Sequence, residues 1–131
     1  MAAFDFAKVK DPTFFKENVL NAHASFRTYA SREEYLAGES SLALKLDGIW
    51  KFAYAKNYTS AIPGFEKTDY DCSGWDDIHV PAHIQMEGYD IPQYANVQYP
   101  WDGREEVQPG EIPQRFNPVA SYVKYFELPD S

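Results

Sequence analysis

One amide side chain, that of Asn96, lies in an aromatic stretch, "YANVQYP" at residues 94–100. An asparagine side chain offers two hydrogen-bond donors and an acceptor, which suits the vicinal hydroxyl groups of a sugar. Tyrosine and tryptophan rings suit the apolar faces of a pyranose, and they also fill protein cores. Either the Asn96 amide contacts a ligand, or it caps a turn. In the second interpretation the core is filled by three rings, those of Tyr94, Tyr99 and Trp101.

The other arrangements of reactive side chains favour ordinary structural roles. His79 and His83 have the spacing of two metal ligands on a helix, but Pro81 between them is incompatible with that helix. We therefore expect each histidine to be hydrogen-bonded or to face solvent. The chain also lacks a phosphate-binding loop and any Ser, His or Cys nucleophile signature, so no catalytic residue is predicted.

An acidic run contains Asp69, Asp71, Asp76 and Asp77. It lacks the glycine and the final glutamate of a calcium-binding loop, and we interpret it as a solvated stretch that forms turns. No metal site is predicted in the chain.

Composition excludes several classes of protein. The chain has 131 residues, of which 44% are hydrophobic, and this indicates a folded domain. The net charge of -8 opposes nonspecific binding to nucleic acid or to an anionic membrane. No stretch reaches the roughly 18 apolar residues of a membrane-spanning helix. The single Cys72 excludes an internal disulfide, and the start "MAAFDFAKVKDP" does not resemble a signal peptide, so we expect a cytoplasmic protein.

Strands are the main elements expected to position Asn96. Apolar residues alternate with others after an Asp-Gly turn, which predicts a strand over residues 49–55. Two further strands are predicted over residues 76–80 and 120–128. The last is apolar on both faces, and we therefore expect it to be central in the sheet.

Two tryptophans and one long loop complete the expected β region. Trp50 and Trp75 each start an apolar strand face, so both are expected to be largely buried. Residues 87–118, which include Asn96, hold five of the nine prolines and three of the seven glycines. We expect a long loop there, of the kind that usually carries function.

The first 40 residues are predicted to form an extended arm with one short helix. Residues 1–30 show neither helical nor strand periodicity, and one helical turn is expected within residues 11–30. Ser31 and Glu34 have the spacing of a capping box, and Gly38 stands where a helix should end. These signals predict a helix over about residues 32–37.

Four segments resemble the amino-terminal part of the large bacterial β-galactosidases of glycoside hydrolase family 2. They are "NAHASFRTYASREE", "LDGIWKFAYA", "SGWDDIHVPAHIQMEGYDIPQYANVQYP" and "FNPVASYVKYFELP". The resemblance spans about residues 18–129. Its most specific part is "VPAHIQMEGYDIPQYANVQYP", in which VP, Q, GYD, P, Y, NV and YP follow one another at nearly the spacing of the family.

The resemblance implies a fold and two site residues. It implies the first part of a jelly-roll β-sandwich, similar to galactose-binding domains, over residues 41–131, preceded by the arm over residues 1–40. The sandwich would be incomplete. Asn96 and Val97 match the family's Asn-Val pair, which reaches into the galactose pocket. The chain departs from the family pattern where Ile84 replaces a Trp, and a Thr-Glu pair is replaced at positions 115–116.

The resemblance also implies a function for the protein to which such a segment contributes. These enzymes hydrolyse terminal β-D-galactosides with retention of configuration, and two glutamates on a TIM barrel perform the chemistry. Neither catalytic position occurs in this chain, which is therefore expected to be inactive alone. Expected partners are a galactoside substrate, the remainder of the enzyme with its barrel, and further copies in a homo-oligomer in which the arm makes subunit contacts.

No cofactor is expected in this segment, although magnesium and sodium ions are frequent in the full enzymes of the family. Neither nucleic acid nor a membrane is expected as a partner. An alternative of another class is a stand-alone carbohydrate-binding module without catalysis. That alternative would require a complete sandwich with its own cleft, and the small number of predicted strands argues against it.

Overall fold

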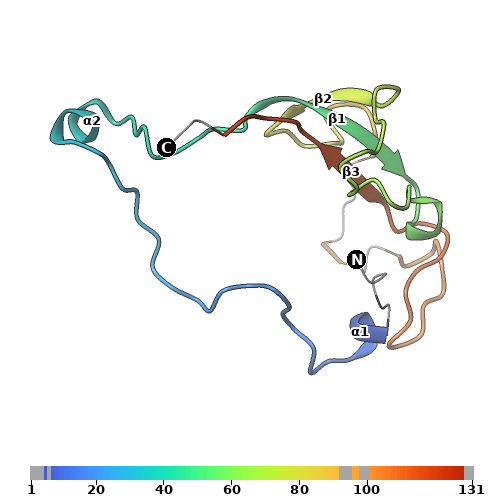
Figure 1. Cartoon of the computed structure of the whole chain (residues 1–131). Helices are drawn as coiled ribbons and strands as arrows, with labels where there is room; N and C mark the ends of the chain where they lie inside the picture. Colours follow the sequence, from blue (N-terminus) through green and yellow to red (C-terminus); the bar gives the residue numbers. More distant parts are fainter. Residues whose placement is uncertain (1–4, 6, 92–95, 98–100, 129–131) are drawn as a thin grey trace. The chain divides into compact units, whose positions relative to one another are not determined.

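The structure is a computed structural model that describes residues 5, 7–91, 96–97 and 101–128 (Figure 1). The chain divides into two compact units, Met1–Leu46 and Asp47–Ser131, and each is a separate body. The longest α-helix among the described residues has six residues. No helix in this part of the chain is long and apolar enough to cross a membrane.

The first unit contains two short helices, α1 at Ala7–Lys10 and α2 at Arg32–Ala37. The Ser31 hydroxyl accepts the backbone N–H of Glu34 at 3.2 Å and caps the start of α2. Gly38 ends this helix in the left-handed conformation, with φ of 72°, which a glycine adopts without steric cost. The predicted helix is confirmed. The described residues 11–30, where one helical turn was expected, contain no α-helix, and α1 precedes them.

Apolar side chains of the first unit lie in solvent. No residue in its described part is buried. Phe15, Leu20 and Phe26 are 82%, 78% and 84% exposed. Such side chains gain free energy only when another surface covers them.

The second unit is built on a three-stranded antiparallel sheet with the order β2-β1-β3 (Figure 1). Its strands are β1 at Gly48–Ala55, β2 at Asp76–Val80 and β3 at Val119–Val123. A single 3₁₀ turn, η1 at Tyr58–Ser60, follows β1. The mostly β fold class is confirmed, and the first two strands begin and end within one residue of the prediction.

The third strand differs from the prediction in both its length and its place. Among the described residues, β3 pairs only with β1, so it is an edge strand and β1 is central. Apolar residues on both faces of a strand indicate that both faces are covered. They do not indicate which strands lie beside it in the sheet. The strand ends at Val123, short of the predicted residue 128, and the Lys124 ammonium that follows it donates to the Ile49 carbonyl at 3.0 Å.

Aromatic rings form the core of the second unit on one face of the sheet. Phe52 and Ile78 are each only 1% exposed. Phe52 lies directly opposite Tyr122 in the strand register, and their ring centroids are 4.9 Å apart. The ring of Tyr89, from the segment after β2, contacts Phe52 from 4.5 Å. This cluster fastens the following loop to the sheet.

Trp50 and Trp75 each have most of their surface covered without being fully enclosed, in keeping with the prediction that both are largely buried. Trp50 lies just beyond the last residue of β1 that pairs with β3, so β3 covers it incompletely. Trp75 precedes β2 and packs against Phe65 and Tyr70, whose ring centroids are each 5.7 Å away. Two neighbouring rings leave part of an indole in solvent.

Candidate functional site

Asn96 and Val97 are exposed residues on the long loop after β2. Val97 is 87% exposed. The flanking Tyr94 and Tyr99 lie outside the described residues, so the interpretation in which their rings fill the core stays a prediction. Because its side chain is exposed, Asn96 is not part of the core. We refer to the Asn96–Val97 pair as the loop tip.

Tyr89 holds the start of this loop on the sheet. Its ring packs on Phe52, and its hydroxyl donates to Asp76 Oδ2 at 3.1 Å. Partial burial raises the pKa of the Tyr89 phenol, and the hydrogen bond to Asp76 raises it further. The phenol therefore remains a donor at neutral pH. Its backbone N–H donates to the Ile84 carbonyl at 3.1 Å, which closes the turn before the loop.

Trp101 holds the other end of the loop. Its indole Nε1 donates to the Phe116 carbonyl at 2.9 Å, and the side chain is half-buried. The Trp101 carbonyl in turn accepts the backbone N–H groups of Arg104 and Glu105 at 2.9 and 3.0 Å. Trp101 thus starts a tight turn that directs Glu105 back toward the segment before β3.

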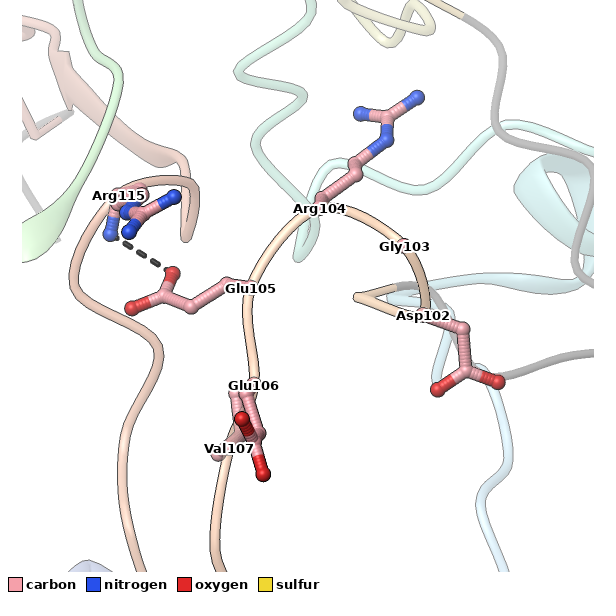
Figure 2. Close-up of a pocket in the computed structure, with 7 residues that line it drawn as sticks. All are labelled: Asp102, Gly103, Arg104, Glu105, Glu106, Val107 and Arg115. Atoms are coloured by element: carbon pink, nitrogen blue, oxygen red, sulfur yellow. Dashed lines mark hydrogen bonds between the residues drawn. The ribbon is translucent and has the colours of Figure 1, made fainter.

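Both carboxylate oxygens of Glu105 accept backbone N–H groups from that segment. Oε1 accepts from Gln114 at 2.7 Å. Oε2 accepts from Arg115 at 2.8 Å, the bond drawn in Figure 2. The N–H groups of Gln114 and then Arg115 hold the pKa of the Glu105 carboxyl below its usual range. A charged carboxylate with two short bonds is a strong link between two pieces of chain.

The segment that Glu105 holds is itself fixed to the end of β1. The Tyr58 hydroxyl donates to Gln114 Oε1 at 3.0 Å and accepts from Gln114 Nε2 at 2.8 Å. The backbone N–H of Asn117 donates to the Lys56 carbonyl at 3.1 Å. These bonds connect the end of the loop to residues that follow β1 directly, so the loop is attached to the sheet at both ends.

A surface hollow of about 460 Å³ lies beside this link (Figure 2). It is lined by Asp102, Gly103, Arg104, Glu105, Glu106, Val107 and Arg115. Figure 2 shows the side chains of Asp102 and Arg104 pointing away from Glu105, which faces Arg115. Polar groups that diverge in this way do not define the convergent contacts of a small-molecule site. The hollow is therefore a shallow depression beside the Glu105 link and not a candidate ligand site.

The described part of the chain contains no cluster of potential metal ligands. No three His, Cys, Asp or Glu side chains gather there where they could hold an ion. His79 lies on β2, and both it and His83 are exposed. No role of magnesium or sodium is assigned to these residues.

Sequence reasoning singled out Asn96 and Val97 but not the residues that hold the loop. Tyr89 belongs to the "GYD" motif, and that motif could have indicated it. Glu105 carries no such signal, since its partners are backbone groups nine and ten residues further along the chain. The role of Asn96 and Val97 in ligand binding stays a prediction.

A small antiparallel sheet that carries a long loop attached at both ends is typical of a ligand-binding β domain. The chain belongs to the family described as "Glycosyl hydrolases family 2, sugar binding domain", whose model matches residues 43–131. The match covers the whole sheet and the loop with its tip.

The names of similar proteins agree with this family assignment. Proteins named beta-galactosidase from Streptococcus thermophilus and Halalkalibacterium halodurans are 42% and 44% identical over 94% of this chain. A beta-galactosidase large subunit from Leuconostoc lactis is 34% identical over 92% of it. The chain spans only 12% of the length of the first two proteins and 21% of the third.

Proposed function

We propose that this chain is the amino-terminal segment of a retaining β-galactosidase. The observation that carries the proposal is its 42–44% identity, over nearly its whole length, to proteins with that name. Since the chain corresponds to about an eighth of their length, the two catalytic glutamates are expected on a barrel outside it. The segment contributes to substrate binding and to assembly.

The proposed contact with substrate is the loop tip. The Asn96 amide donates to and accepts from galactose hydroxyls, and Val97 presents an apolar side chain beside it. The exposure of both residues supports this role, as does the attachment of the loop at Tyr89 and Trp101. A loop with fixed ends presents its tip at a lower entropic cost than a free one.

The remaining features of the proposal concern the larger protein. The sheet is the first part of a jelly-roll sandwich, which strands of the larger protein complete. The exposed apolar side chains of the arm support a role in subunit contacts of a homo-oligomer. The enzyme is cytoplasmic, and any magnesium or sodium ions belong to its other domains.

Hydrolysis of a chromogenic β-D-galactoside by the complete gene product tests this function. We expect turnover with retention of configuration at the anomeric carbon, which nuclear magnetic resonance of the first-formed sugar can follow. Absence of turnover, combined with galactose binding by the complete gene product in calorimetry, would favour a stand-alone carbohydrate-binding module. Absence of both turnover and binding would refute any role in galactoside recognition.

A further inference from the structure

Glu105 is held by two backbone donors in a loop that the proposed function assigns to substrate binding. We propose that Glu105 is a positioning residue for the galactoside: its carboxylate fixes the turn that starts at Trp101 and thereby limits where the loop tip can lie. This inference rests on the proposed function. Glu105 is proposed to affect substrate binding through the loop, without contact to the substrate itself.

The first step is the number of bonds that attach this end of the loop. Without Glu105, the side chain of Trp101 is joined to the segment before β3 by its hydrogen bond to Phe116. This bond and the cation–π contact of Arg104 both reach the same residue, Phe116, so together they still allow the turn to pivot there. The two bonds of Glu105, to Gln114 and Arg115, add two further points of attachment and so fix the orientation of the turn.

The second step is the reach of the chain. Trp101 follows Asn96 by five residues, and five residues span at most about 18 Å when fully extended. The position of Trp101 therefore limits the volume that the Asn96 amide can occupy. If the turn is loosened, the Asn96 amide can occupy a larger volume. The fraction of loop conformations in which the amide is placed for binding then falls, and the apparent affinity falls with it.

The third step is the choice of side chain. Two consecutive N–H groups, of Gln114 and Arg115, point at one residue, and a carboxylate has an acceptor oxygen for each. The amide of a glutamine has only one such oxygen, and its NH₂ group would face an N–H donor. The Arg104 guanidinium lies 5.2 Å from the ring centroid of Phe116, so the same two pieces of chain also meet through a cation–π contact.

The chain offers a matched control one residue away. Glu106 carries the same charge and lines the same hollow, but no described residue forms a hydrogen bond with its carboxylate. The substitutions Glu105→Gln and Glu106→Gln therefore remove the same charge from nearly the same place, and only the first removes one of the two bonds of the link. Glu105→Asp keeps both oxygens but withdraws them by one methylene group.

The experiment measures kcat and KM for a chromogenic β-D-galactoside in the complete gene product and in the three variants. Hydrogen exchange of the peptide that covers residues 94–101 provides a second readout that needs no activity. For Glu105→Gln we expect KM to rise roughly three- to tenfold, kcat to stay within about twofold, and exchange of the peptide to accelerate. Glu106→Gln should match the wild type, and Glu105→Asp should be intermediate.

A wild-type KM in Glu105→Gln overturns the inference, whether or not the variant loses stability. Equal effects of Glu105→Gln and Glu106→Gln also overturn it, since they would reflect charge alone. If Glu105→Gln does not fold, Glu105→Asp decides the matter, and a wild-type KM in that variant is the contrary result. If the wild type does not cleave the galactoside, the proposed function fails, whereas unchanged exchange in Glu105→Gln would contradict the positioning role separately.

Discussion

Replacement of Phe52 by alanine should weaken the sheet and release the start of the loop. Phe52 is 1% exposed, and its ring contacts Tyr89 at 4.5 Å and Tyr122 at 4.9 Å between centroids. Truncation of a fully buried phenylalanine costs about 3–5 kcal/mol, the sum of lost transfer free energy and a residual cavity. The two ring contacts place Phe52→Ala toward the upper end of that range.

The assay is amide hydrogen exchange of peptides that cover β1 and β3, which reports the local free energy of opening. Ile49→Ala is a control on the same strand, because Ile49 is 48% exposed and its truncation should cost about 1 kcal/mol. Exchange of the peptide that contains Tyr89 should also accelerate in Phe52→Ala. A loss below about 1 kcal/mol in Phe52→Ala would refute the assignment of this ring to the core.

Three further outcomes are expected. Tyr89→Phe keeps the ring but loses the bond to Asp76, so local opening near Tyr89 should become easier by about 0.5–1.5 kcal/mol in hydrogen exchange, and an unchanged value would contradict that bond. The pKa of Glu105 lies below its ordinary value of 4.5, so its carboxylate stabilises the fold above pH 4.5 and loses this effect as the pH falls through the lower, folded pKa. The difference in thermal midpoint between wild type and Glu105→Gln should therefore be present at pH 7 and disappear well below pH 4.5; a difference that persists would show another origin. The isolated 131-residue chain should not cleave a chromogenic β-galactoside and should bind galactose at millimolar level or not at all, since retention requires two carboxyl groups about 5 Å apart that the resemblance places elsewhere.

Local patterns in the sequence predicted the local elements well. The strand around Phe52 follows from the alternation of apolar residues, and helix α2 follows from Ser31, Glu34 and Gly38. In each case, neighbours within a few residues determine the conformation. Asn96 was singled out because its motif is contiguous.

Properties set by distant partners could not be predicted in the same way. The place of β3 at the edge depends on which strands lie beside it, and the apolar faces of residues 119–123 do not encode that order. The part of Trp50 that stays exposed depends on where β3 stops. The link at Glu105 joins a side chain to backbone N–H groups, which every residue except proline carries, so no residue type at the other end could indicate it.

The central claim is that Asn96 serves substrate binding and not the fold. The direct measurement is kcat/KM for a β-galactoside, with thermal unfolding alongside, in the complete gene product and in its Asn96→Ala variant. Asn57→Ala gives the stability pattern of an asparagine that caps a turn, because the Asn57 side chain accepts the backbone N–H of Ser60 at 2.9 Å.

One lost hydrogen bond to a bound sugar costs on the order of 1–3 kcal/mol, which corresponds to about a tenfold to hundredfold change in rate. Asn96→Ala should therefore lower kcat/KM by about tenfold to hundredfold and leave the thermal midpoint nearly unchanged. Near-normal kinetics together with a thermal midpoint lowered as in Asn57→Ala would contradict the account and make Asn96 part of the scaffold.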